Sequence, residues 1–426
     1  MTDINLINNL WVILAALFVF TMTVAVGLLE VGELSMRYSN SLLKTLLITG
    51  TALFIMAFIG FNTAFAPTIM GIIGNPLYNG LFLSGFSTNA PGILTGVWWS
   101  MTTQYFGTGL TTGTYFLFET AFASVTLALV GVVALKKMKI EAFIAFAVIY
   151  FILIWNLPVA WIWNPTGWLY LMGVRDFAGG LIVHGAAGIA GLAIVLKIWQ
   201  EEKLKGLKKS PQINPVISPG WLTFAILLLW VGWFGFNPGS VLAFNSEAMV
   251  VVITTFLAAA SAFLSTMLTQ YYVTKTNPGL IYAANGILIG LIIITPIAGF
   301  VSPASSVILG LLGGPLFVAG EKFFNNQKWF SDPVGLFPGH LLGGIFGVAM
   351  IAFFTQKAFA AASGNANLPN GLLFGGGVAA IQQLGLEMLA VVIVAVVVFI
   401  ISYISLWLIG LAFHGITTDY NNEENV

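Results

Sequence analysis

Two of the three histidines in this chain lie in matching segments that are 156 residues apart. Residues 176–191 read DFAGGLIVHGAAGIAG, residues 332–347 read DPVGLFPGHLLGGIFG, and both fit the pattern D-x2-G-x4-H-x3-G-I-x-G. His184 and His340 align in this repeat, and so do Asp176 and Asp332. A pair of histidines placed by a repeat favours a shared chemical role over a merely structural one.

Both histidines lie inside long apolar stretches, where an ionisable residue is costly and usually serves a pathway or a partner. Neutral imidazole carries one hydrogen-bond donor and one acceptor, so two adjacent rings could pass a proton and line a narrow, dry pore. The alternative is a structural role, in which each histidine only joins neighbouring helices by hydrogen bonding. Zinc normally takes four ligands, and the chain has no cysteine and no second ligand cluster, so we expect no metal.

Several carboxylates accompany the histidines in these apolar stretches. Asp176 and Asp332 begin their stretches and are expected to cap helices by accepting free backbone N–H groups. Asp176 has a second candidate role, in which it orients backbone carbonyls toward a cation. Glu30 and Glu119 should face the protein interior or water, because lipid disfavours a charged side chain.

The composition predicts the elements that must hold these groups. Of the 426 residues, 58% are hydrophobic and only 7% are charged, too few to cover a water-facing surface. Long continuous apolar runs recur along the whole chain, which favours membrane helices over a β-barrel. We predict an all-α polytopic membrane protein whose eleven spans lie at about 8–31, 45–67, 108–134, 141–162, 176–198, 219–240, 245–271, 279–299, 303–320, 333–356 and 383–412.

The basic residues predict the orientation of these spans. Thirteen of the fifteen Lys and Arg residues fall in loops on one side, and only Arg175 and Lys357 fall on the other. Short loops rich in Lys and Arg stay in the cytoplasm. We therefore expect a multi-pass protein of the cell (plasma or inner) membrane, with the N-terminus outside and the C-terminus in the cytoplasm. The net charge of zero gives no case for nucleic acid.

The two histidine segments are five spans apart, and an odd shift reverses their direction across the membrane. Residues 1–412 are therefore expected to form one transmembrane domain with two inverted repeats around a central pore, at about 8–198 and 219–356. An extra span follows at about 383–412, and then a short cytoplasmic tail at 413–426. Transporters built from inverted repeats place their site near the midplane, between the repeats.

Three motifs resemble those of the ammonium transporter (Amt/Mep/Rh) family, on its Amt-like branch. They are the two histidine segments and GWFGFNPGS at 232–240, and the likeness runs from the first span to the last. The resemblance implies a homotrimer in the lipid bilayer with one pore per subunit, which transports NH4+ or NH3, and methylammonium as an analogue. The sequence contains no nucleophile–base–orienter set and no nucleotide-binding loop, so we expect no enzyme activity and no cofactor.

The resemblance also implies roles for individual residues. His184 and His340 would be the paired pore histidines, and Phe122 and Phe236 a stacked gate above them. Substrate recruitment at the outer side would use Phe118, Trp163 and Ser240, with Asp176 supporting the site from below. The outer tryptophans Trp99, Trp161, Trp163 and Trp168 could alternatively form a belt at the membrane interface.

The chain departs from the family pattern at Glu30, at Glu119, at Gly335 and in the tail. Glu119 stands where a neutral amide is common, one residue after Phe118, so we include it among the substrate-binding residues. Gly335 stands where an aspartate is common. The tail is short, which makes regulation by a nitrogen-signal protein doubtful.

Two alternative functions stay open from the sequence: a channel for neutral ammonia or small amines, and an ammonium sensor. Glu119 and the outer tryptophans favour recruitment of a cation over a neutral gas.

Overall fold

The protein is described here by a computed structural model, which describes residues 3–34, 38–84, 109–134, 137–206, 217–327, 329, 332 and 334–418. Within these residues, ten helical segments are long and apolar enough to cross a membrane, and the shorter apolar helix Leu280–Ile294 matches the eighth predicted span. The predicted all-α membrane architecture is confirmed. Residues 419–426 of the predicted tail lie outside the described residues, as do five of the basic residues used for orientation: Arg37, Lys136, Lys208, Lys209 and Lys328.

The first half of the chain holds the helices up to α9, which directly follows the first histidine. In order, they are α1 (Asp3–Leu34), α2 (Tyr38–Ile55), η1 (Met56–Gly60), α3 (Phe61–Phe65), η2 (Leu81–Leu83), α5 (Thr112–Ala134), α6 (Ile140–Ile149), η4 (Tyr150–Ile154), α7 (Asn156–Ile162), α8 (Trp168–Met172), η5 (Gly180–Gly185) and α9 (Ala186–Leu204). A short hairpin of β1 (Thr68–Ile69) and β2 (Ile73–Gly74) lies between α3 and η2.

The second half holds the helices that complete the bundle. They are α10 (Pro219–Gly239), α11 (Ser246–Thr274), α12 (Leu280–Ile294), α13 (Pro303–Asn325), η6 (Leu336–Leu341), α14 (Leu342–Phe354), α15 (Lys357–Ala362), η7 (Leu372–Phe374) and α16 (Gly377–Ala412).

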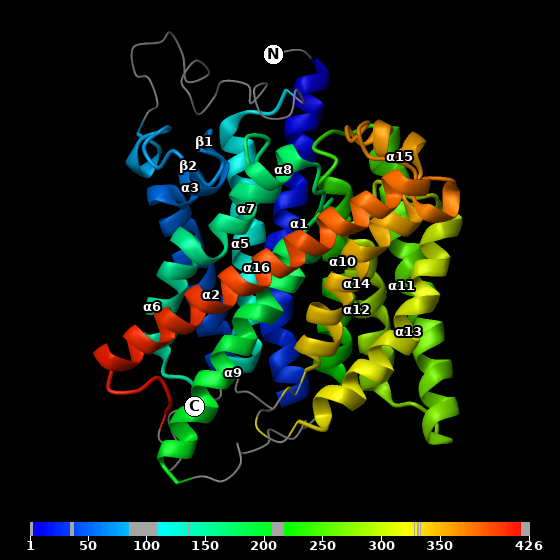
Figure 1. The fold of residues 1–426 in the computed structure, drawn as a ribbon. Helices are drawn as coiled ribbons and strands as arrows, with labels where there is room; N and C mark the ends of the chain where they lie inside the picture. The colour runs from blue at the N-terminus through cyan, green and yellow to red at the C-terminus, as the bar shows by residue number, and fades with distance from the viewer. Residues whose placement is uncertain are drawn as a thin grey trace.

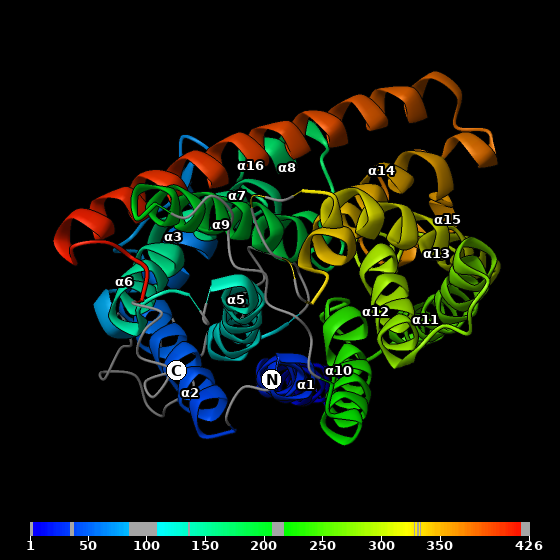
Figure 2. The same cartoon turned by 90° about the horizontal axis from the view of Figure 1, so that it is seen from below.

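The long helices run between two faces of the molecule. We call the face nearest the start of α1 the upper face, at the top of Figure 1, and the opposite one the lower face. The chain descends through α9 and ascends through α14, so the two histidine segments run in opposite directions (Figure 1). The helix α16 lies obliquely across α9 and α14 along one side of the bundle (Figures 1 and 2).

Buried charges near the lower face are paired. The Glu30 carboxylate bonds the Lys44 amine, which accounts for the acid that the sequence places in the first span. Lys137 and Glu202 form a second buried pair, with 3.3 Å between nitrogen and oxygen. A charge buried with its partner avoids most of the penalty of an isolated one.

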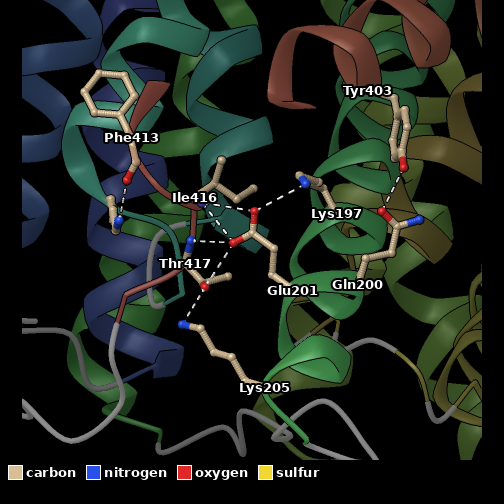
Figure 3. A network of polar contacts seen from close by, with 9 residues as sticks. Lys197, Gln200, Glu201, Lys205, Tyr403, Phe413, Ile416 and Thr417 are labelled. Carbon is tan, nitrogen blue, oxygen red and sulfur yellow. Dashed lines mark hydrogen bonds and ion pairs between the residues drawn. The ribbon is translucent and has the colours of Figure 1, made fainter. Parts of the chain in front are cut away.

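The chain after α16 is bonded to the lower face as a strap, defined here as residues 413–418. The Glu201 carboxylate accepts from the backbone N–H groups of Ile416 and Thr417, at 2.9 and 3.1 Å (Figure 3). Lys205 donates to the Thr417 hydroxyl at 3.1 Å. The Lys139 backbone N–H donates to the Ile416 carbonyl at 2.8 Å, so the strap joins α9 to the loop before α6.

Candidate functional site

Both histidines lie on single π-helical turns that begin with a capped N-terminus. His184 is in η5 and His340 is in η6. The Asp176 carboxylate accepts four backbone N–H groups at 2.7–3.1 Å, those of Gly179, Gly180, Leu181 and Ile182. The Asp332 carboxylate accepts those of Leu336 and Phe337, at 2.9 and 2.8 Å. The predicted capping roles of both aspartates are confirmed, and the capped turns set the position of each imidazole.

The two imidazoles meet at the centre of the bundle. Their Nδ1 atoms are 3.0 Å apart, and their ring planes are inclined by 48°. One Nδ1 must donate and the other accept, so the two neutral rings are opposite tautomers, and one Nε2 is an acceptor while the other is a donor. The buried Nε2 of His184 has no hydrogen-bond partner among the described residues.

A narrow cavity of about 20 Å³ lies against this pair. The other lining side chains are apolar or aromatic: Met22, Val26, Leu29, Val125, Leu129, Leu229, Trp233, Phe236 and Leu288. The cavity has room for about one small molecule, and apart from the imidazoles it offers little that could replace the hydration shell of an ion.

A column of aromatic rings leads from the paired histidines toward the upper face. Phe236 stacks on His184 with 5.6 Å between ring centroids. Phe122 follows at 4.4 Å from Phe236, and Phe118 at 4.8 Å from Phe122. Phe122 and Phe236 are in contact as expected, but their planes are inclined by 45°, so the pair is tilted and not stacked.

A larger cavity of about 540 Å³ lies above this column, toward the upper face. Its lining includes all five residues expected to bind substrate: Phe118, Glu119, Trp163, Asp176 and Ser240. The Trp163 indole donates to the Asp176 carbonyl at 2.6 Å, and the Ser240 hydroxyl donates to the Phe236 carbonyl at 2.8 Å. These bonds orient the indole and leave the lone pairs of the Ser240 oxygen able to accept.

Two ionisable side chains, Glu119 and Arg175, also line this larger cavity. Glu119 is buried and is hydrogen-bonded by Tyr115, and its Oε2 atom has no hydrogen-bond partner among the described residues. Arg175 lies over the Tyr170 ring at 4.0 Å and donates to the carbonyls of Tyr170 and Val174. Burial lowers the pKa of the Arg175 guanidinium, while Tyr170 and Glu387 act in the opposite direction.

Some residues of this site were not expected from the sequence. Trp233 stacks on both His184 and Phe236 and donates to the Thr295 hydroxyl at 3.1 Å. Its place three residues before Phe236, on the same helix face, was the available signal. The predicted interfacial belt is wrong for Trp161, which is buried and donates to the Ile72 carbonyl at 2.7 Å, and Trp99 lies outside the described residues.

The chain is similar to known proteins over nearly its whole length. An ammonium transporter of Bacillus subtilis is 29% identical over 420 residues, which is 95% of this chain and 92% of that protein. A solved structure described as a sensor Amt protein has a TM-score of 0.82 at 25% identity, over 99% of this chain and 97% of that one. Saccharomyces cerevisiae Mep2 has the same fold, with a TM-score of 0.81 at 23% identity, over 99% of this chain and 90% of that one.

The model of the Ammonium Transporter Family matches residues 10–425. Members of this family are transporters and not enzymes. With its bundle of membrane-spanning helices, this chain belongs to the Ammonium Transporter Family.

Proposed function

We propose that this protein recruits NH4+ in the larger cavity, deprotonates it, and conducts ammonia along the paired histidines, with or without a separately relayed proton. The observation that carries this proposal is the contact between His184 and His340 in a narrow apolar cavity beneath a column of aromatic rings. That arrangement admits a small molecule with hydrogen-bonding ability and disfavours a hydrated ion.

Recruitment would depend on the mixed lining of the larger cavity. The faces of Phe118 and Trp163 attract a cation through their ring quadrupoles. The Ser240 oxygen can accept an ammonium N–H, and the Glu119 carboxyl group adds a further acceptor oxygen beside the rings. The fixed indole of Trp163 keeps this arrangement ready before substrate arrives.

The transfer below this cavity would favour ammonia over ammonium. Moving an ammonium ion into an apolar passage costs far more than moving a neutral amine, so the ion would leave its proton at the level of the rings. Neutral ammonia keeps a lone pair and three N–H donors, which can pair with the free Nε2 of His184. Sodium and potassium have no neutral form and would be excluded.

The architecture supports the inverted repeat around this passage. A Cβ on Gly188 would lie 2.6 Å from the Cβ of Leu341, and a Cβ on Gly344 would lie 3.2 Å from the nitrogen of Gly185. Gly188 corresponds to Gly344 in the repeat, and Gly185 corresponds to Leu341. The two contacts are thus reciprocal, as a pseudo-twofold axis between the histidine segments would require.

We further propose that the protein acts as a homotrimer in the cell membrane, with its upper face outside. Methylammonium is expected to be an alternative substrate.

The test is the transient current from proteoliposomes on a solid-supported membrane after an NH4+ pulse, with a K+ pulse for comparison. An NH4+-selective current that is lost in His184→Ala/His340→Ala supports electrogenic transport through the pair. The matched control is His414→Ala, because His414 is exposed on the lower face and lies outside both cavities. A current that survives the double substitution contradicts the proposed route.

A second candidate is an ammonium sensor, favoured by the similarity to the structure described as a sensor Amt protein. A sensor would bind NH4+ without carrying it. The absence of a current together with a rise in internal pH would indicate conduction of neutral ammonia. The absence of both a current and a pH change would indicate that the protein binds ammonium without transporting it.

A further inference from the structure

The chain between α8 and η5 carries part of the backbone of the larger cavity. Residues 174–176 have no regular secondary structure, so their backbone groups need partners from elsewhere in the molecule. Asp176 lines the larger cavity, caps the turn that holds His184, and accepts the Trp163 indole N–H at its carbonyl. The position of this segment therefore affects both the Trp163 ring and the capped turn.

Two side chains of α16 hold the segment. The Glu387 Oε1 atom accepts the backbone N–H of Arg175 at 3.0 Å. The Gln383 side-chain amide donates to the Gly173 carbonyl at 3.0 Å and to the same Glu387 oxygen at 2.6 Å. Gln383 and Glu387 are four residues apart, so they share one face of the helix. We call this pair of side chains the α16 anchor.

The α16 anchor is buried, and it depends on one oxygen atom. Glu387 is 0% exposed and Gln383 is 6% exposed. Both bonds end on Oε1, whereas Oε2 is buried and has no hydrogen-bond partner among the described residues. An acceptor oxygen at this place is what the bonds require, and a carboxyl or an amide can supply it. Loss of that oxygen would leave buried donors unsatisfied, which costs more than the bonds themselves contribute.

The residues on either side of Asp176 are held by different elements. The α16 anchor bonds the residues before it, and the Phe177 backbone N–H donates to the Pro296 carbonyl at 3.1 Å. The guanidinium of Arg175 lies over the Tyr170 ring, and both side chains line the larger cavity. The anchor is therefore bonded directly to a residue of the cavity lining, although α16 itself lies on the outside of the bundle (Figures 1 and 2).

We propose that Glu387 is a positioning residue for ammonium recruitment, because with Gln383 it fixes residues 173–176 and so places the Asp176 carbonyl and the Trp163 ring at the larger cavity. This inference rests on the proposed function, in which that cavity recruits NH4+. Glu387 lines neither of the two cavities, so it acts through the segment and not by contact with the ion.

The test is a pair of substitutions at one position. Glu387→Leu removes the acceptor oxygen, whereas Glu387→Gln keeps it and removes only the ionisable group. In Glu387→Leu we expect the half-saturating ammonium concentration from the upper face to rise about fivefold, because only molecules with the segment in place bind ammonium well. The saturating current should stay close to the wild-type value. Glu387→Gln should restore the wild-type half-saturation.

A second variant covers the case in which Glu387→Leu does not fold. Gln383→Leu removes both donors of that side chain and should raise the half-saturating concentration in the same direction.

The matched control is Val394→Ala, a fully buried residue of α16 that lies seven residues after Glu387 and outside the anchor. Loss of packing alone should lower the unfolding temperature and the saturating current, without a change in half-saturation. If Glu387→Leu behaves in this way, its role is only structural and the proposal is overturned. An equal rise in Glu387→Gln and Glu387→Leu also overturns it, because the carboxyl group and not the acceptor oxygen would then be required.

A further readout does not depend on transport. The Arg175 amide hydrogen should exchange with solvent about tenfold faster in Glu387→Leu than in Glu387→Gln or the wild type, because its acceptor is lost. Unchanged exchange in Glu387→Leu refutes the anchor whatever the currents show. If the wild-type protein carries no ammonium, the transport function fails, while faster exchange in Glu387→Leu still supports the positioning of the segment by α16.

Discussion

At the residue scale, the carboxyl group of Glu119 is predicted to set the apparent affinity for ammonium at the upper face. Glu119 lines the larger cavity next to Phe118, and Glu119→Gln keeps the shape of the side chain but removes a group that can ionise when ammonium binds. We expect the half-saturating ammonium concentration from the upper face to rise about tenfold, because a charge-assisted interaction is lost. Solid-supported-membrane currents at a series of ammonium concentrations measure this.

The control for this variant is Glu247→Gln. Glu247 is also a buried acid near the upper face, in the first turn of α11, but it does not line the larger cavity. A similar loss of affinity in both variants would mean that the general field of the upper face, and not a contact in the cavity, attracts the ion.

Residue-level prediction succeeded where the repeat marked the chemistry. His184, His340 and the two aspartates share one pattern, and their geometry follows from it. Trp233 has no such mark, because a tryptophan in an apolar helix is equally compatible with helix packing and with the membrane interface. Only the three-dimensional arrangement shows that it lines the narrow cavity at the paired histidines.

At the scale of elements, the two glycines after the histidines are predicted to set the approach of the histidine segments. In Gly344→Ala the new Cβ would lie 2.2 Å from the Gly180 carbonyl oxygen, and in Gly188→Ala it would lie 2.6 Å from the Leu341 Cβ. Overpacking of this kind costs about 1–3 kcal/mol, so both variants should lower the thermal unfolding temperature and reduce transport. Gly344→Ala should be worse, because the obstacle is backbone.

The matched control for the glycines is Gly50→Ala in α2, where a new Cβ would meet nothing within 4 Å. It should leave the unfolding temperature unchanged or slightly raised, since alanine favours a helix over glycine. If all three alanine variants have the same unfolding temperature, the prediction that Gly188 and Gly344 allow close approach of the histidine segments is wrong.

The strap of residues 413–418 is predicted to depend on Glu201. In Glu201→Ala the backbone N–H groups of Ile416 and Thr417 lose their acceptor, and the amide hydrogens of the strap should exchange about tenfold faster or more. Hydrogen-exchange mass spectrometry of peptides covering the strap measures this. The control is Gln200→Ala, which removes only the contact with Tyr403; equal acceleration in both would show that α9 itself has loosened.

The number of membrane-spanning elements could be predicted from the sequence, but the type of helix within them could not. The eleven apolar stretches were long enough to be read as spans, and the described helices match them. The π-helical turns at the histidines were not foreseen, because periodicity does not distinguish one wide turn within a helix. Their freed backbone groups need outside partners, such as the Trp155 indole that donates to the Ile182 carbonyl at 3.0 Å, and such contacts come from distant parts of the chain.

At the scale of the whole molecule, the distribution of basic residues predicts that the upper face lies outside the cell. The chain has no cysteine, so a single introduced thiol reports on one position without background. Leu77 is 64% exposed in the loop after β2, and Leu204 is 88% exposed at the lower end of α9. A membrane-impermeant maleimide should label Leu77→Cys in intact cells and Leu204→Cys only after the membrane is opened, because short loops rich in Lys and Arg stay in the cytoplasm. The reverse labelling pattern would mean that the upper face lies in the cytoplasm. Recruitment in the larger cavity would then serve export.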